Sequence, residues 1–408
     1  MSEPLTHAGR RLRVAHFTLG RCNPDSANGV DKSIYYLARS QAELGHHVAV
    51  FSLTDKPPLP IPGVNVFTHA PLRLPIPLLS PRQRDLFVNR SPLNVPKPLV
   101  RDIIAWRPDV LHLHFVHIPP NVFLARRLSP HIPYCVTIHG GLAPAAQRRN
   151  PWQKRLFGLL FEREYLKRAA FLHAISERDL EGLDSYGVTN TTVLAPNGID
   201  LDSLAPPRGE VAQPPFQQRL NGRKVFLYLG RVDPQQKGLD LLVRAFALWQ
   251  PDEAALVLVG PDWRGGHRLL EDLSHSLGIA HLVVLAGPAF GQQKIDTLRS
   301  SHVFVHPSRW EAGVPFSVLE AAALERPCLI SPAADPQHTL ARSGAAVSVT
   351  PTPEGIAEGL RRISSMSVDE LSRMGARARE IVRTEFSWPR TAEVLIEAYR
   401  RHALGRRG

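Results

Sequence analysis

The sequence predicts an α/β protein with two doubly wound, parallel-sheet domains. Short apolar runs alternate with amphipathic stretches along the chain, which is the pattern of repeated βα units. This alternation restarts near Lys224, after a polar, proline-containing stretch at Ala205–Pro215 that is typical of an interdomain linker. We therefore expect one domain over residues 1–203 and a second over residues 204–387.

The first domain should contain several strands separated by helices such as Val30–Leu44 and Trp152–Lys167. Its strand candidates are Arg13–Leu19, His47–Leu53, Val64–His69, Pro108–Phe115, Tyr134–His139, Ala170–Ser176 and Thr192–Pro196. Those of the second domain are Lys224–Arg231, Ala254–Pro261, Leu282–Gly287, His302–Pro307 and Pro327–Ser331. A proline-rich stretch at residues 71–98 is too long for a plain connection, which indicates a functional or mobile loop. Because such sheets bind ligands at the carboxyl ends of their strands, we expect the site in a cleft between the domains.

Composition excludes several classes of protein. The 408 residues are 43% apolar and 21% charged, so each domain can bury a core and wholesale disorder is excluded. Three well-separated cysteines, Cys22, Cys135 and Cys328, exclude a disulfide framework, and no Cys-x-x-Cys pair suggests zinc or redox chemistry. The N-terminal stretch MSEPLTHAGRRLRVAHFTLG has no apolar signal region, and no apolar run approaches the ~18 residues of a membrane span. These features predict a reduced, soluble, cytoplasmic protein.

The net charge of +12 is concentrated in the first half of the chain. Residues 1–200 hold 24 Lys and Arg against 15 Asp and Glu, whereas residues 201–408 hold 25 against 22. This asymmetry favours an anionic partner, which could be a phosphorylated substrate, a membrane surface or nucleic acid, although an arginine-rich genome would raise the same number. No recognisable module interleaves exposed aromatics with cations, so we expect no nucleic-acid partner.

The segment Arg148–Arg168 combines seven cations with apolar residues around Trp152. This composition is typical of an amphipathic helix at a membrane interface. A core helix with a solvated basic face would have nearly the same composition. The first interpretation predicts salt-sensitive binding to anionic membranes.

Two glutamates occur in the segment VFVHPSRWEAGVPFSVLEAAALERPCLIS (Val303–Ser331). Glu311 lies in a turn after a buried strand, and Glu320 lies about one turn into a helix that begins near Phe316. A carboxylate accepts two hydroxyl hydrogen bonds at once, and a helix N-terminus offers free N–H groups to a phosphate or a sugar. Taken alone, the pair could equally be a solvated turn glutamate and a helix-surface glutamate.

Two cations, Arg231 and Lys237, occur in the segment FLYLGRVDPQQKG (Phe226–Gly238). They stand on a loop at the carboxyl end of a predicted strand, where two cations can straddle a diphosphate. In so basic a protein they could also be two exposed side chains.

Together these motifs resemble the retaining GT-B glycosyltransferases of family GT4. The resemblance covers nearly the whole chain and rests on the order and spacing of GRVDPQQKGLDLLVRAF, VFVHPSRWEAGVPFSVLEAAALERP, APNGIDLDSL, NGVDKSIYYLARSQAELGHHVAVFS, WRPDVLHLH, VTIHGG and FSWPRTAEVLIEAYR. It implies a GT-B fold, in which two Rossmann-like domains face each other across a cleft. The first would bind the acceptor and the second the nucleotide-sugar donor, and a closing helix at residues 388–408 would return to complete the first.

The resemblance also implies roles for single residues. Arg231 and Lys237 match the pair that neutralises the diphosphate leaving group, a task that can replace a metal ion. Glu320 matches the glutamate that holds the ribose hydroxyls, and Glu311 matches the one that contacts the donor sugar. The other implied positions are the backbone of Gly313, Val314, Pro315 and Phe316, the loop residues Asn28 and Gly29 near the diphosphate, and His139 beside the donor sugar and acceptor.

The implied activity is transfer of a hexosyl unit from a UDP- or GDP-linked sugar to a glycan or lipid-linked acceptor, in cell-surface polysaccharide or glycolipid biosynthesis. We expect no cofactor and no metal, and the catalytic set would be Glu311, His139, Arg231 and Lys237. A lipid-linked acceptor at the inner face of the cytoplasmic membrane would explain the basic first half. Two other interpretations stay open, a GT-B sugar-nucleotide epimerase and a sugar-nucleotide-binding pseudoenzyme.

Two positions depart from the family pattern. Eight residues, Ala312–Leu319, separate Glu311 from Glu320 where the family usually has seven, so Ala312 resembles an insertion in the turn. Asn28-Gly29 replaces two glycines, a mild change because Asn tolerates left-handed backbone.

Two other patterns admit a metal-binding interpretation. Asp200-Leu201-Asp202 has the form of a D-x-D motif, but it follows Asn197-Gly198 at a domain exit, which favours a turn. His112, His114 and His117 suggest zinc, because the first two point to one face of a strand. Since no carboxylate or cysteine completes that set, we expect strand-end histidines that line a cleft.

Overall fold

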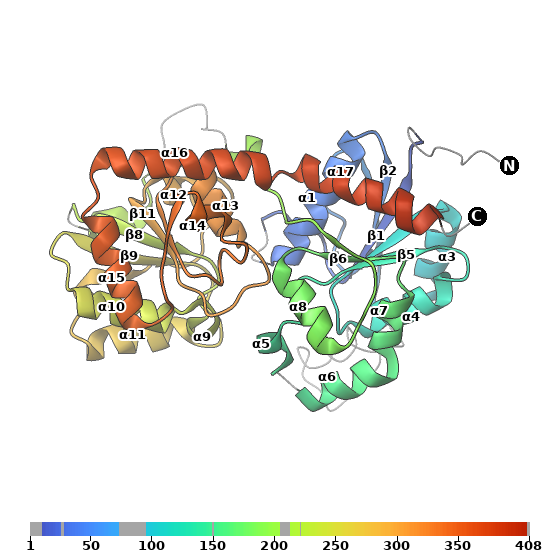
Figure 1. Ribbon diagram of the computed structural model, residues 1–408, viewed down its shortest axis with the longest axis horizontal. Coiled ribbons are helices and arrows are strands. Elements are labelled where there is room, and N and C mark those ends of the chain that lie inside the picture. The colour runs from blue at the N-terminus through green and yellow to red at the C-terminus, as the bar shows by residue number, and fades with distance from the viewer. Residues whose placement is uncertain are drawn as a thin grey trace. The chain divides into compact units, whose positions relative to one another are not determined.

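The computed structural model describes residues 10–25, 28–72, 95–148, 151–204, 213–220 and 222–405. The chain forms two compact units, called unit 1 (Met1–Gly198 with Trp388–Gly408) and unit 2 (Ile199–Ser387). Each unit has one sheet of parallel strands with helices packed on it (Figure 1). The predicted α/β class with two parallel-sheet domains is confirmed.

The sheet of unit 1 has seven strands in the order β3-β2-β1-β4-β5-β6-β7. Their bounds are β1 Arg13–Thr18, β2 His47–Leu53, β3 Val64–His69, β4 Val110–His114, β5 Tyr134–Thr137, β6 Leu172–Ala174 and β7 Thr192–Leu194. The central strands β1 and β4 are buried along nearly their whole length, and both carry buried histidines among their apolar residues.

The helices of unit 1 come from both ends of the chain. They are α1 Gly29–Glu43, α3 Lys97–Trp106, α4 Pro119–Leu128, α5 Pro144–Gln147, α6 Pro151–Phe157, α7 Arg163–Arg168, α8 Glu177–Tyr186 and α17 Trp388–Ala398. A π-helical turn, Gly158–Glu162, joins α6 to α7, and another, Tyr399–Leu404, follows α17. The C-terminal segment packs on α1, where Trp388 stacks on Tyr36 with ring centroids 5.9 Å apart.

Unit 2 has six parallel strands in the order β10-β9-β8-β11-β12-β13. The strands are β8 Lys224–Leu229, β9 Ala254–Val259, β10 Val283–Leu285, β11 Val303–His306, β12 Cys328–Ile330 and β13 Ala346–Ser348. The helices are α9 Pro234–Lys237, α10 Leu239–Trp249, α11 Gly266–Ser276, α12 Gly291–Arg299, α13 Phe316–Ala323, α14 Thr339–Arg342, α15 Pro353–Ser364 and α16 Val368–Glu385.

Strand order reverses direction once in each sheet, between β1 and β4 in unit 1 and between β8 and β11 in unit 2. At such a switch point the loops that follow the two central strands diverge and leave room for a ligand. The motif containing Arg231 and Lys237 follows β8, and the motif containing Glu311 follows β11. The fold therefore places both motifs at the switch point of unit 2.

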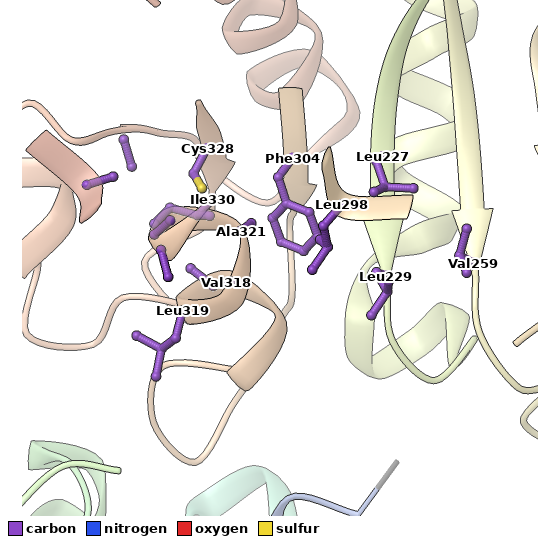
Figure 2. Packing of buried hydrophobic residues seen from close by; sticks show 14 of the residues in the cluster. Leu227, Leu229, Val259, Leu298, Phe304, Val318, Leu319, Ala321, Cys328 and Ile330 are labelled. Atoms are coloured by element: carbon purple, nitrogen blue, oxygen red, sulfur yellow. The ribbon is translucent and has the colours of Figure 1, made fainter. Parts of the chain in front are cut away.

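Helix α13 is fixed to the sheet of unit 2 by an apolar cluster. Figure 2 shows Val318, Leu319 and Ala321 of α13 in the same cluster as Phe304 of β11 and Ile330 of β12, and all of these side chains are fully buried. Burial of a side chain such as Leu or Val contributes about 1.5–3 kcal/mol. Because Glu320 stands on this helix, the same packing fixes its position.

The predicted strands agree with the structure to within two residues at each end. One strand was missed, β13, which has three residues and follows Gly344. Most of the predicted loop at residues 71–98 and most of the predicted linker Ala205–Pro215 lie outside the described residues. In the described part of the chain, no helix is both long and apolar enough to cross a bilayer.

Candidate functional site

A close approach between two loops builds the site of unit 2. Lys237 ends the single-turn helix α9, and Gly238 follows it with φ +65°. A Cβ at Gly238 would lie 2.3 Å from the carbonyl oxygen of Pro307, so only glycine lets α9 end against the loop after β11. This contact brings Lys237 to the turn that carries Glu311.

Glu311 is the centre of a buried polar cluster. Its Oε1 accepts hydrogen bonds from Lys237 Nζ at 2.6 Å, Ser308 Oγ at 2.5 Å and His306 Nε2 at 3.1 Å. Burial by itself would raise the pKa of Glu311, but Lys237 and His306 outweigh it and lower that pKa to about 2. Glu311 is therefore an ionised acceptor whose position is fixed on three sides, and the extra residue Ala312 does not separate it from Lys237.

His306 was not singled out from the sequence. Burial lowers its pKa in spite of the neighbouring Glu311, so the ring is neutral and donates its Nε2–H to the carboxylate. Its Nδ1 is buried and has no hydrogen-bond partner among the described residues. Its position could have indicated a role in the site, because His306 is the last residue of β11 and stands five residues before Glu311.

Arg231 is held beside this cluster without a carboxylate partner in the described chain. Its guanidinium lies 4.4 Å from the ring centroid of Trp263 and donates to Gln236 Oε1 at 3.0 Å. The hydroxyl of Tyr228 donates to the backbone carbonyl of Arg231 at 2.8 Å, which fixes the loop after β8. Stacking on an aromatic ring orients the cation but leaves its charge uncompensated, so the residue can bind an anion.

Glu320 has a different cation for its partner. Its carboxylate lies 2.7 Å from Lys294 Nζ of α12, and both side chains are largely buried. The two glutamates of the motif therefore contact separate lysines, Lys237 and Lys294. Sequence reasoning missed Lys294, since no local pattern links it to a residue 26 positions away.

The N-terminus of α13 adds a neutral binding surface. The partly exposed residues there are Gly313, Val314, Pro315 and Phe316. Pro315 is the cap residue, and its own side chain makes no capping hydrogen bond. The positive end of a helix dipole favours a phosphate or a polarised hydroxyl.

In unit 1, the predicted loop residues begin helix α1. Asn28 is the cap residue, and its side chain accepts a hydrogen bond from Val30 N at 3.2 Å. Its φ of −88° is extended rather than left-handed, so capping, and not tolerance of left-handed backbone, explains the asparagine. Asn28 and Gly29 are both exposed.

His139 terminates a buried chain of hydrogen bonds through unit 1. The chain runs from the Ala195 carbonyl through His173, Thr137, His112, Tyr399, Gln41, His16 and His114 to His139. Its donor–acceptor distances lie between 2.6 and 3.2 Å. We call this set the histidine chain. It connects β1, β4, β5 and β6 of the sheet with α1 and the C-terminal segment.

The histidine chain corrects one expectation. His112 and His114 are buried and do not line a cleft, although His114 is, as expected, the last residue of its strand. His16 joins them, because β1 pairs with β4 in a register that puts His16 beside His112. The third predicted member, His117, instead contacts Glu162 through its backbone N–H.

Burial makes the histidines of this chain neutral. It lowers the pKa of His16 and His173 to about 4 and that of His139 to about 3. Burial also lowers the pKa of His112 and His114 well below the ordinary value. Five imidazoles therefore pack in one core without charge repulsion near neutral pH.

We expect unit 1 to lose stability steeply as the pH falls from about 6.5 to about 4. In that window the unfolded chain binds protons that the folded histidines do not bind, and each group lowers the free energy of unfolding by about 1.4 kcal/mol per pH unit. Asp179, whose pKa burial raises to about 7, acts in the opposite direction and offsets one histidine. Urea unfolding at several pH values, followed by hydrogen exchange of β4 and β5, measures the slope. His173→Gln should reduce it and exposed His281→Gln should not; a pH-independent midpoint would contradict the expectation.

The segment Arg148–Arg168 is largely helical, and its first half exposes apolar side chains. Trp152, Leu156, Leu159 and Leu160 are 68%, 50%, 57% and 56% exposed. Tyr165 and Leu166 of α7 are buried in the core of unit 1. The segment thus combines both sequence interpretations, an exposed apolar and basic first half and a core-packed second half.

Comparisons with known proteins match both units. The family model described as Glycosyltransferase Family 4 matches residues 27–203, and the one described as Glycosyl transferases group 1 matches residues 223–365. D-inositol 3-phosphate glycosyltransferase of Kineococcus radiotolerans is 31% identical over 246 residues, which is 54% of either chain. Phosphatidyl-myo-inositol mannosyltransferase of Mycobacterium leprae is 25% identical over 92% of this chain and 93% of its own. The chain spans about half the length of the curated relatives that it matches at 31% identity.

Two solved structures illustrate the fold. Sucrose-phosphate synthase from Thermosynechococcus elongatus superposes with a TM-score of 0.76 at 20% identity, over 98% of this chain and 100% of its own. The Anabaena protein HepE, in complex with UDP and glucose, superposes with a TM-score of 0.70 at 16% identity, over 96% of this chain and 100% of its own.

Proposed function

This chain belongs to the GT4-type glycosyltransferases of GT-B fold, and we propose that it moves a hexosyl unit from a UDP- or GDP-linked sugar to a glycan or lipid-linked acceptor with retention of configuration. The observation that carries this proposal is the pair of cations at the switch point of unit 2, Arg231 and Lys237, beside the ionised Glu311. Unit 2 would bind the donor and unit 1 the acceptor.

The cations suit a diphosphate leaving group. When the bond between the anomeric carbon and the β-phosphate oxygen breaks, negative charge grows on the phosphate. Arg231 has no carboxylate partner among the described residues, and Lys237 gives Glu311 one of its three N–H donors. Both can therefore bind phosphate oxygens while the cluster stays assembled.

The two glutamates suit hydroxyl groups of the donor. We propose that Glu320, oriented by Lys294, accepts from the ribose hydroxyls and that Glu311 accepts from a hydroxyl of the transferred sugar. We propose His139 as a further group that acts on the sugar, and Asn28 with Gly29 as backbone contacts of the diphosphate. Two relatives are named as glycosyltransferases of D-inositol 3-phosphate and of phosphatidyl-myo-inositol, which supports an acceptor with a polyol or lipid character.

A nucleotide screen tests the donor proposal. Thermal unfolding is measured with UDP, GDP and several of their sugars; a ligand at a hundred times its Kd stabilises by about 2.7 kcal/mol. Arg231→Ala should lose this stabilisation, whereas Arg268→Ala, which removes an exposed cation on α11, should keep it. Stabilisation by no nucleotide would refute the proposal. Binding without transfer of a radiolabelled sugar to any acceptor would leave the pseudoenzyme interpretation.

We propose that the exposed half of the Arg148–Arg168 segment contacts an anionic membrane surface. Trp152, Leu156 and Leu160 are spaced by four residues, so they share one side of the helix, and Lys154 and Arg155 lie between them. An apolar side flanked by cations is typical of helices that lie in a membrane interface. The contact would bring the enzyme to a lipid-linked acceptor.

Changing the apolar side is expected to weaken membrane binding. Leu156→Ser with Leu160→Ser should lower binding to vesicles that contain anionic lipid about 100-fold or more, because two exposed leucines contribute about 1.5 kcal/mol or more each when buried. Leu269→Ser, an equally exposed leucine of unit 2, is the control. Binding in the wild type should fall as salt rises. Equal binding to neutral and anionic vesicles, or none, would rule the membrane contact out.

A further inference from the structure

The histidine chain has a fixed direction, because one end is a backbone carbonyl. The Ala195 oxygen can only accept, so His173 must donate its Nε2–H to it. A neutral His173 then has an unprotonated Nδ1, which accepts from the hydroxyl of Thr137. Because the Thr137 hydroxyl donates its only hydrogen to His173, its oxygen accepts a hydrogen bond from His112 Nε2–H at 2.6 Å. The anchor thus sets the tautomers of His173 and His112.

The same reasoning continues through the C-terminal segment. His112 Nδ1 is unprotonated and accepts from the hydroxyl of Tyr399 at 2.6 Å. The Tyr399 oxygen accepts from Gln41 Nε2–H at 3.1 Å, and Gln41 Oε1 accepts from His16 Nε2–H at 2.8 Å. If the Gln41 amide were rotated, each hydrogen bond between Gln41 and His173 would reverse its direction, and His173 would need a proton on both nitrogens. Burial of the His173 ring opposes that charged form.

The final steps reach the proposed catalytic histidine. His16 Nδ1 accepts from His114 Nε2–H at 3.0 Å, and His114 Nδ1 accepts from His139 Nε2–H at 3.2 Å. His139 therefore has its proton on Nε2 and an unprotonated Nδ1. Gln41 and Tyr399 are both fully buried, so water does not replace these links.

We propose that Tyr399 and Gln41 are positioning residues that hold His139 in the tautomer with an unprotonated Nδ1. His139 then accepts a hydrogen bond from a ligand hydroxyl at Nδ1 and cannot donate one there. This inference rests on the proposed function only for the identity of that ligand, a hydroxyl of the sugar or the acceptor. The direction of the chain itself depends on unit 1 alone.

A metal ion is the competing explanation for part of this cluster. One nitrogen from each of His16, His112 and His114 lies within 4.8 Å of the others. Both nitrogens of His112 are already hydrogen-bonded, to Tyr399 and to Thr137, and a metal would need a lone pair that the directed chain uses. Each ring nitrogen of His16, His112 and His114 therefore has a hydrogen-bond partner without an ion.

Ring ¹⁵N spectra of the histidine-labelled full chain test the proposal without any donor or acceptor. The His139 signals, assigned with His139→Gln, should show a protonated Nε2 and an unprotonated Nδ1 at neutral pH. Tyr399→Phe should shift His139 towards a mixture of tautomers, because the link between His112 and Gln41 is cut. Tyr134→Phe is the matched control, since the Tyr134 hydroxyl donates to the Tyr165 carbonyl in the same unit but outside the chain.

A second pair of variants keeps the test decisive if Tyr399→Phe does not fold. Thr137→Val has nearly the same shape and lacks the hydroxyl, so it should also give mixed tautomers, whereas Thr137→Ser should restore the wild-type spectrum. A wild-type His139 protonated on Nδ1, an unchanged tautomer in folded Tyr399→Phe or Thr137→Val, or one tightly held zinc ion per chain would overturn the proposal. Nucleotide binding, measured separately, tests the proposed function and does not depend on these spectra.

Discussion

Replacing Lys237 with methionine is expected to lower turnover by about 10²- to 10³-fold, because the change removes one of the two charges proposed to stabilise the departing diphosphate. The change also leaves Glu311 buried without its cation, and breaking a buried pair costs about 3–5 kcal/mol of stability. A loss of turnover could therefore reflect unfolding alone.

A double variant separates the two effects. Lys237→Met with Glu311→Gln removes both charges and keeps both shapes, so it should recover most of the stability and none of the turnover. Arg268→Ala on α11 is the control, because that cation is 89% exposed and lies outside the cluster. Thermal unfolding and transfer of labelled sugar are measured on the same preparations. Near-normal turnover in folded Lys237→Met would end its assignment to the leaving group.

Changing Glu320 or Glu311 to glutamine is expected to affect nucleotide affinity and turnover differently. Glu320→Gln should weaken every nucleotide ligand about 10- to 100-fold, because a hydrogen bond to a charged group contributes about 1.5–3 kcal/mol in ground and transition states alike. Glu311→Gln should keep or improve the affinity for free nucleoside diphosphate, since Lys237 loses its carboxylate partner. Its turnover should nevertheless fall about 10²-fold, because its proposed partner is the sugar that moves.

Calorimetric titration with the free nucleoside diphosphate and with its sugar distinguishes these outcomes. If Glu311→Gln weakens the free diphosphate as much as Glu320→Gln does, the proposed division of roles is wrong. Deleting Ala312 is a further check. Because Glu311 already reaches Lys237 and Ser308 with the extra residue present, the deletion should lower sugar-dependent affinity rather than raise it.

Much of the fold was predictable because many of its buried parallel strands are apolar along nearly their whole length. Strands such as Ala254–Val259 stand out in the sequence for that reason. The strand Ala346–Ser348 did not, since three residues are too few to show a period. The close approach at Gly158 was also not predictable, because it involves the distant Tyr186, whose hydroxyl would lie 2.0 Å from a Cβ at that glycine.

The arrangement of the candidate site was predictable where its residues follow one another along a strand and the loop after it. Arg231, Lys237, Glu311 and Glu320 stand in two short motifs, and the topology of the sheet puts both motifs at one switch point. Lys294 and His16 were missed, because their partners are defined by helix packing and strand register rather than by spacing. The direction of the hydrogen bonds in the histidine chain was not predictable either, because it depends on the position of one backbone carbonyl, that of Ala195.

The return of the C-terminal segment to unit 1 has a consequence for synthesis. His112 hydrogen-bonds Tyr399, which the ribosome adds 287 residues later, and at 5–20 residues per second this takes about 15–60 seconds. Until then the buried polar groups of Gln41 and His112 lack this partner, whereas unit 2, Ile199–Ser387, is one continuous stretch of chain that is complete 12 residues before Tyr399 is added. The half of the enzyme that is translated second is therefore the first that can finish folding, and the first half must wait, partly open, for the end of translation.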